Sequence, residues 1–173
     1  FFYLCLCPMG VNFRKLKTTI MKDLFSVDGK VIVITGATGI LGSAMVKHFA
    51  EQGAKVVILA RNEQMGGDLM AEVKAAGGEA LYLKCDVTQK QMLEQNYADI
   101  MAAYGRIDVL INCAGGNMAA ATVPPEKTIF DLDIDAVRQV VDLNLFGTIL
   151  PTMVFVKAMV EQGQGSIINI ASE

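Results

Sequence analysis

Three glycines, each three residues after the last, are the first candidates for chemistry in this sequence. Gly36, Gly39 and Gly42 follow the apolar run 30–35 and precede a helical stretch, 43–52. At a strand-to-helix junction, glycines let the backbone turn sharply and let a pyrophosphate approach the amide groups at the start of the helix. Two interpretations remain open, because a tight turn that only packs a helix closely on a sheet needs the same residues.

Two polar residues follow the next apolar run, 55–60, where a dinucleotide-binding fold meets the adenosine ribose. An acid at this position would bind the 2′-hydroxyl of NAD. Arg61 suits a 2′-phosphate instead, because its guanidinium offers a fork of charged donors, and Asn62 adds an amide. The sequence therefore favours NADP over NAD. A solvated loop arginine is the alternative.

Two later strand ends carry further candidates for the same crevice. They are Asp86, Val87, Asn112, Ala114 and Gly115. Asp86 also has an alternative role as the cap of a helix that begins near Thr88. His48, the only histidine, stands alone in a helical stretch and is expected to have a surface or packing role.

Strands and helices alternate along the chain, which predicts the elements that position these residues. The expected strands are 30–35, 55–60, 80–85, 107–113 and 166–170. The expected helices are 43–52, 62–76, 88–104 and 134–161, the last broken near Gly147 and Pro151. This pattern predicts an α/β, Rossmann-like, doubly wound parallel sheet with strand order 3-2-1-4-5. The ligand crevice is expected at the carboxyl ends of the first and fourth strands.

Composition excludes several classes of function. The chain is 53% hydrophobic and 19% charged, and its formal charge of −3 offers no basic surplus to hold a nucleic acid. No unbroken run of 18 apolar residues predicts a membrane span. Cys5 and Cys7 have no histidine or further cysteine nearby, so no metal site is expected. Four cysteines without a disulfide pattern favour a reduced, cytoplasmic setting.

Both ends of the chain have unusual features. The sequence opens on Phe1, and a short polar lead into the first strand begins at Met21. Residues 1–20 are therefore expected to be extraneous or disordered, and residues 21–173 to form an incomplete NAD(P)-binding Rossmann domain. The last strand stops at Ile170, three residues before the end of the sequence. We expect an N-terminal fragment whose sheet is truncated after the fifth strand.

Taken together, the motifs resemble the short-chain dehydrogenase/reductase family over essentially all of residues 21–173. The resemblance rests on Thr35-Gly36-x-x-Gly39-x-x-Gly42, Asp86-Val87, Asn112-Cys113-Ala114-Gly115, Asn144 within Asp142–Gly147, and Ile168–Ser172. It implies a hydride-transferring oxidoreductase that uses NADP or NAD. Within the family, local stretches of sequence such as Ile111–Asn117 resemble the branch of D-mannonate oxidoreductase (fructuronate reductase) and gluconate 5-dehydrogenase.

The resemblance also implies roles for single residues. The glycine loop would hold the pyrophosphate, and the implied cofactor contacts there are Gly36, Thr38, Gly39, Ile40, Leu41 and Gly42. Asp86 would lie near the adenine, and the motif from Asn112 to Gly115 would steady the sheet beside the cofactor. Asn144 would belong to a proton relay, and Ser172 would orient the substrate carbonyl. The substrate would be a sugar acid or a similar hydroxy/keto compound, and the full-length form a homo-oligomer.

Three departures from the family pattern limit these expectations. The glycines fall every third residue, as in the extended branch of the family, and Cys113 replaces the second asparagine of the Asn-Asn-Ala-Gly motif. The Tyr-x-x-x-Lys motif that supplies the general acid/base does not occur within the 173 residues. The chain alone is therefore expected to be inactive. A non-catalytic NAD(P)-binding regulatory module and a nonfunctional truncated product are the alternatives.

Overall fold

Five parallel strands form the single sheet of the computed structural model, which describes residues 25–171. Their order is β3-β2-β1-β4-β5, as the sequence predicts. The strands are β1 (Val31–Thr35), β2 (Lys55–Ala60), β3 (Glu79–Lys84), β4 (Val109–Asn112) and β5 (Ser166–Asn169). The chain reverses direction of travel across the sheet between β3 and β4, so β1 and β4 are neighbours at the topological switch point.

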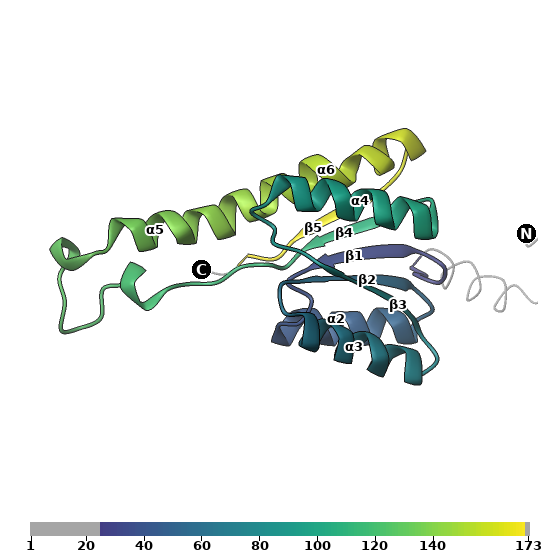
Figure 1. Cartoon of the computed structure of the whole chain (residues 1–173), viewed down its shortest axis with the longest axis horizontal. Coiled ribbons are helices and arrows are strands. Elements are labelled where there is room, and N and C mark those ends of the chain that lie inside the picture. The colour runs from purple at the N-terminus through teal and green to yellow at the C-terminus, as the bar shows by residue number, and fades with distance from the viewer. Residues whose placement is uncertain (1–24, 172–173) are drawn as a thin grey trace, which may run out of the picture.

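Helices cover both faces of the sheet. They are α2 (Ile40–Glu51), α3 (Glu63–Ala75), α4 (Lys90–Tyr104), α5 (Ile134–Val141) and α6 (Gly147–Gln162). Figure 1 shows α2 and α3 on one face and α4 and α6 on the other. A π-helical segment, Asp142–Phe146, joins α5 to α6, and α5 projects beyond the strands. Two short 3₁₀ turns, Ala119–Ala121 and Ile129–Asp131, lie in the loop between β4 and α5.

Alternate residues of the central strands fill two separate cores. All five residues of β1 are buried: Val31 and Val33 pack with α4 and α6, whereas Ile32 and Ile34 pack with α2 and α3. A parallel strand covered on both faces is apolar at nearly every position, which accounts for the runs Val31–Ile34 in β1 and Val56–Ala60 in β2. This rigid double-sided sheet fixes the positions of the loops at its carboxyl edge.

The structure corrects two details of the predicted elements. Helix α2 begins at Ile40, not at residue 43, because Gly39 is its N-cap and Gly42 already belongs to the helix. Pro151 does not break α6; it is buried inside the helix. Its missing N–H would face the carbonyl of Gly147, the first residue of α6 directly after the π-helical segment. The predicted segment 1–20, Cys5, Cys7 and Ser172 lie outside the described residues.

The stretch Ile134–Gln162 is long and apolar enough to cross a membrane, judged by length and composition alone. An 18-residue window within it has a mean hydropathy of 1.6, although isolated polar residues interrupt the stretch so that it holds no unbroken apolar run of that length. Val154, Phe155 and Ala158 are each at most 1% exposed and pack into the core that α6 and α4 form with the sheet. Along this side α6 acts as a core helix of the sheet.

Candidate functional site

The three glycines at the junction of β1 and α2 have different surroundings, which explain the absence of a side chain at each position differently. Gly36 has a φ of +62°, and a Cβ there would lie 2.7 Å from the Cα of Ala114 on the neighbouring strand end. A Cβ on Gly42 would lie 2.5 Å from the Gly36 carbonyl oxygen. A Cβ on Gly39 would meet only that same oxygen, at 3.3 Å. The packing of the fold therefore requires glycine at positions 36 and 42. It requires glycine less strongly at position 39, where the missing side chain leaves the backbone of the turn accessible.

The first turn of α2 offers backbone N–H groups without a competing side chain. Gly39 provides no side-chain cap, and the first turn contains no acidic residue. The side chains of Ile40 and Leu41 are 92% and 62% exposed beside this turn, and Thr38 is half-buried next to it. Uncapped amides at the positive end of a helix favour a negatively charged group, and the exposed aliphatic side chains add apolar contact area beside it.

Thr35 connects the ends of β1 and β4 and was not among the predicted site residues. Its buried Oγ1 accepts hydrogen bonds from the backbone N–H groups of Cys113 and Ala114, both at 3.1 Å. Half-buried Ala114 thus lies against Gly36, and exposed Gly115 follows it. A polar residue at the end of an otherwise apolar strand was the signal that could have identified Thr35.

The end of β2 presents Arg61 and Asn62 at the surface. Arg61 is exposed and forms no ion pair with any of residues 25–171. Asn62 is the N-cap of α3, and its Oδ1 accepts a hydrogen bond from the N–H of Met65 at 3.0 Å. Part of its polar side chain therefore already stabilises the helix, which the sequence did not predict.

Just after β3, Asp86 does not cap the following helix, as the alternative interpretation expected, but closes a turn before it. Its Oδ1 accepts hydrogen bonds from the Thr88 N–H at 3.0 Å and the Thr88 hydroxyl at 2.7 Å. The helix itself begins later, with Gln89 as N-cap of α4. Val87 is only 6% exposed, and its side chain packs against Gly147 at the start of α6.

Asn112 is a buried structural link rather than an exposed contact. It is 2% exposed, and its Nδ2 donates to the Thr152 Oγ1 at 3.0 Å and to the Asn169 Oδ1 at 2.9 Å. Its own Oδ1 has no partner among the described residues. This amide ties β4 to α6 and β5, in line with the sheet-steadying role that the resemblance implied.

Asn144 lies in the π-helical segment and clamps the loop that follows β4. Its Nδ2 donates to the carbonyl oxygens of Gly116 at 2.7 Å and Val140 at 2.8 Å, and its Oδ1 accepts from the Gly116 N–H at 3.1 Å. Thr148 donates its hydroxyl to the Asn144 carbonyl at 3.1 Å. π-Helical turns inside α-helices are frequent at functional sites, and this one brings Asn144 to the loop beside the crevice.

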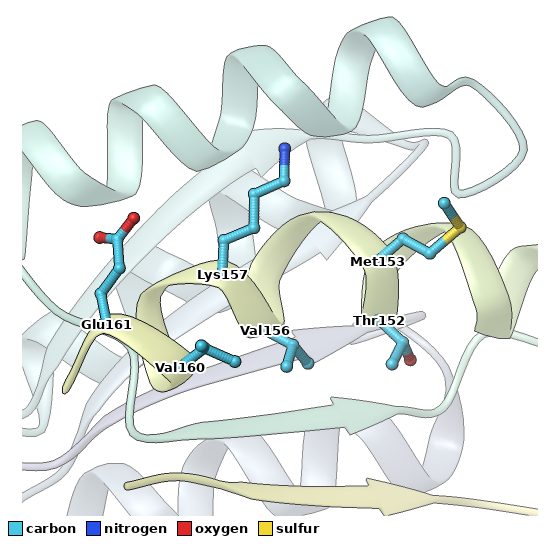
Figure 2. Close-up of a pocket in the computed structure, with 6 residues that line it drawn as sticks. All are labelled: Thr152, Met153, Val156, Lys157, Val160 and Glu161. Carbon is cyan, nitrogen blue, oxygen red and sulfur yellow. The ribbon is translucent and has the colours of Figure 1, made fainter. Parts of the chain in front are cut away.

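A hollow on α6 meets the site residues at Thr152, the hydrogen-bond partner of Asn112. It is lined by Thr152, Met153, Val156, Lys157, Val160 and Glu161. In Figure 2, Thr152, Val156 and Val160 point from α6 toward the strand side, and Lys157 points toward α4. None of the predicted cofactor contacts lines this hollow, so the candidate site remains the carboxyl edge of β1, β2, β3 and β4.

Comparison with known proteins agrees with this arrangement. A family model described as short chain dehydrogenase matches residues 30–173. The chain belongs to the short-chain dehydrogenase family. It is 37% identical over 152 residues to the uncharacterized oxidoreductase UxuB of Bacillus subtilis, covering 83% of this chain and 55% of that protein. It is equally, 37%, identical to a 3beta-hydroxysteroid dehydrogenase of Mediterraneibacter gnavus, covering 84% of this chain and 50% of the relative.

Solved structures of other short-chain dehydrogenases superpose on this one. A protein from Haemophilus influenzae, assigned as a D-mannonate oxidoreductase and bound to NAD, gives a TM-score of 0.80 at 34% identity, over 87% of this chain and 57% of its own. A metagenomic short-chain oxidoreductase in complex with NADP gives 0.76 at 32% identity, over 86% and 64%. The family and the resemblance to the mannonate branch are confirmed. The chain spans about half the length of the two curated relatives described above.

Proposed function

We propose that the carboxyl edge of the sheet binds a nicotinamide dinucleotide, with its pyrophosphate over the glycine turn. The observation that carries this proposal is the contrast between the three glycines beside uncapped amides: a Cβ at Gly36 or Gly42 would lie within 2.7 Å of backbone atoms, whereas a Cβ at Gly39 would meet a single atom at 3.3 Å. A ligand that must approach the backbone closely explains a glycine at the position where the packing demands it least. The residues present therefore fit the cofactor.

Each part of the nucleotide has residues of suitable chemistry at this edge. The amides of Ile40 and Leu41 would hold the pyrophosphate, since the Gly39 N–H already donates to the Gly36 carbonyl at 3.0 Å, and the exposed side chains of Ile40 and Leu41 would cover apolar parts of the nucleotide. Asp86 has one carboxylate oxygen engaged with Thr88, and its other oxygen would face the adenosine. When bound, the reduced cofactor would give a hydride to a carbon of the substrate, and the oxidised cofactor would accept one from it.

Arg61 supports NADP as the preferred cofactor. Its guanidinium is exposed at the end of β2 and has no acidic partner within residues 25–171. A 2′-phosphate would provide such a partner, with two parallel charge-assisted hydrogen bonds. NAD, which carries a hydroxyl there, would gain less from the same side chain.

The complete protein would oxidise or reduce a hydroxy/keto compound, and a sugar acid such as D-mannonate or gluconate is the proposed substrate class. The likeness to the mannonate branch, at 34% identity, supports this class, although a steroid dehydrogenase is 37% identical in sequence. Asn144 would hold the loop at Gly116 and so position the proton path, and Ser172 would orient the substrate carbonyl. The exposed apolar residues Met153 and Val160 on α6 support a homo-oligomer. The unpaired thiols of Cys85 and Cys113 support a reducing, cytoplasmic setting.

Calorimetric titration of the 173-residue chain with NADPH and NADH tests the proposed cofactor site. Gly39→Val should weaken both nucleotides by about tenfold or more, the effect of losing hydrogen bonds to a charged group. Gly67→Val is the matched control, because Gly67 lies inside α3 and a Cβ there would meet nothing within 4 Å. Unchanged binding by Gly39→Val would contradict the site. Hydride-transfer assays with sugar acids on the complete protein test the activity.

A further inference from the structure

A pair of opposite charges stands beside Arg61 and has no part in the site described so far. The Lys84 Nζ lies 2.6 Å from the Glu63 Oε1, and both side chains are largely exposed, at 58% and 65%. Glu63 is the first residue of α3, and Lys84 is the last residue of β3. The pair thus bridges two elements at the same edge of the sheet.

The register of the sheet places this pair at the proposed ribose position. Ala60, the residue before Arg61, is the direct partner of Lys84 in the β2–β3 ladder, and the Cys85 N–H donates to the Ala60 carbonyl at 3.0 Å. Glu63 follows Arg61 by two residues. Two cations and one anion therefore share this corner, and the acid is the group that a 2′-phosphate would meet with repulsion.

Packing between α3 and β3 holds the two elements that carry Glu63 and Lys84. The Tyr82 hydroxyl donates to the Ala60 carbonyl at 3.2 Å, and its ring fills the space where a side chain at Gly66 would have to lie. This close approach holds the first turns of α3 against β3. The hydrogen bond and charge of Lys84 lower the pKa of Glu63, and those of Glu63 raise the pKa of Lys84, so both groups are charged at neutral pH.

Exposed ion pairs contribute little to folding stability, so stability gives no strong reason for this one. We propose that Lys84 neutralises Glu63 and thereby sets the preference of the crevice for NADP over NAD. The inference rests on the proposed cofactor site. With Lys84 in place, the corner has a net charge of +1 from Arg61. Without Lys84, the Glu63 carboxylate cancels Arg61 and opposes a 2′-phosphate.

A set of variants in the 173-residue chain tests this role by calorimetric titration with NADPH and NADH. Lys84→Met should raise the Kd for NADPH about fivefold and leave the Kd for NADH within about twofold, as expected for one screened, exposed charge near a phosphate. The double variant Lys84→Met/Glu63→Gln should return the ratio of the two dissociation constants to the wild-type value, because its net charge again comes from Arg61 alone. The Lys84→Met effect should shrink at 0.5 M salt.

Lys47→Met is the matched control, because Lys47 forms an ion pair of the same 2.6 Å length with Glu72, between α2 and the later part of α3. It should leave the ratio of dissociation constants unchanged. An unchanged ratio in Lys84→Met would overturn the role of the pair. So would a double variant that stays as weak as Lys84→Met, since Lys84 would then contact the phosphate directly. If the unmodified chain binds neither nucleotide, the proposed cofactor site is wrong. If it binds both but Lys84→Met leaves their ratio of dissociation constants unchanged, only the role of the ion pair is wrong.

Discussion

Gly42 provides a quantitative test of the glycine turn. In Gly42→Ala, the new Cβ would lie 2.5 Å from the Gly36 oxygen and within 2.9 Å of two backbone atoms of Ala37. Real Cβ contacts essentially never fall below 3.0 Å, so the turn must open by at least about 0.5 Å. All three neighbours are backbone atoms, so no side chain can rotate away to relieve the contact.

The expected cost follows from two opposing effects. Overpacking of this kind costs about 3 kcal/mol at the upper end of its usual range. Alanine in place of glycine in a helix returns up to about 1 kcal/mol. The net loss in the free energy of unfolding is therefore about 2 kcal/mol, which corresponds to a Tm lower by roughly 4–8 °C for a domain of this size.

Urea unfolding followed by circular dichroism measures this loss, with Gly67→Ala as the control. A Cβ at Gly67, inside α3, meets nothing within 4 Å, so this variant should gain about 0.5–1 kcal/mol from helix propensity alone. The two variants make the same chemical change in opposite surroundings. Equal midpoints for Gly42→Ala and Gly67→Ala would refute the packing role assigned to Gly42.

Three further predictions concern the elements that support the site. Burial raises the pKa of Asp108, but its bonds to Arg106 and to the Val31 N–H outweigh this and hold it below the ordinary 3.8. The ionised Asp108 carboxylate therefore stabilises the fold above about pH 4, and this stabilisation is lost as the pH falls below that value. Urea titrations should show this pH-dependent loss in the wild-type chain but not in Asp108→Asn. Phe155→Ala, at a fully buried position, should cost about 3–5 kcal/mol in urea unfolding. Asn62→Ala should cost about 1 kcal/mol through the lost helix cap, and an unchanged urea midpoint would contradict that role.

The sheet could be predicted from sequence because its signals are local. The run 55–60 is β2 to the residue, and the strand order follows from the handedness of successive crossovers. The predicted break near Gly147 marks a real change, from π-helix to α6, whereas the predicted break at Pro151 is wrong. The π-helical turn Asp142–Phe146 has no signal in the local sequence pattern, which predicts one continuous helical stretch with a break.

The candidate site was predictable in its backbone and less so in its side chains. The glycine spacing located the turn, but the separate reasons for Gly39 and Gly42 depend on distances to atoms that only the fold brings together. Thr35 escaped because its hydrogen-bond donors lie 78 and 79 residues away. The Lys84–Glu63 pair likewise needs the β2–β3 register. The roles given to Asn144 and Ser172 stay predictions.

The neighbours β1 and β4 have a consequence for how the domain assembles. Ile32 pairs with Val109, a larger separation along the chain than in any other ladder of the described sheet. Contacts between such distant residues carry a greater entropic cost of loop closure than contacts between near ones. The seam between β1 and β4 should therefore form after β1, β2 and β3 have paired. The glycine turn meets the end of β4 at the same seam. A nucleotide bound there would stabilise only the finished sheet, and should therefore slow unfolding more than it speeds folding.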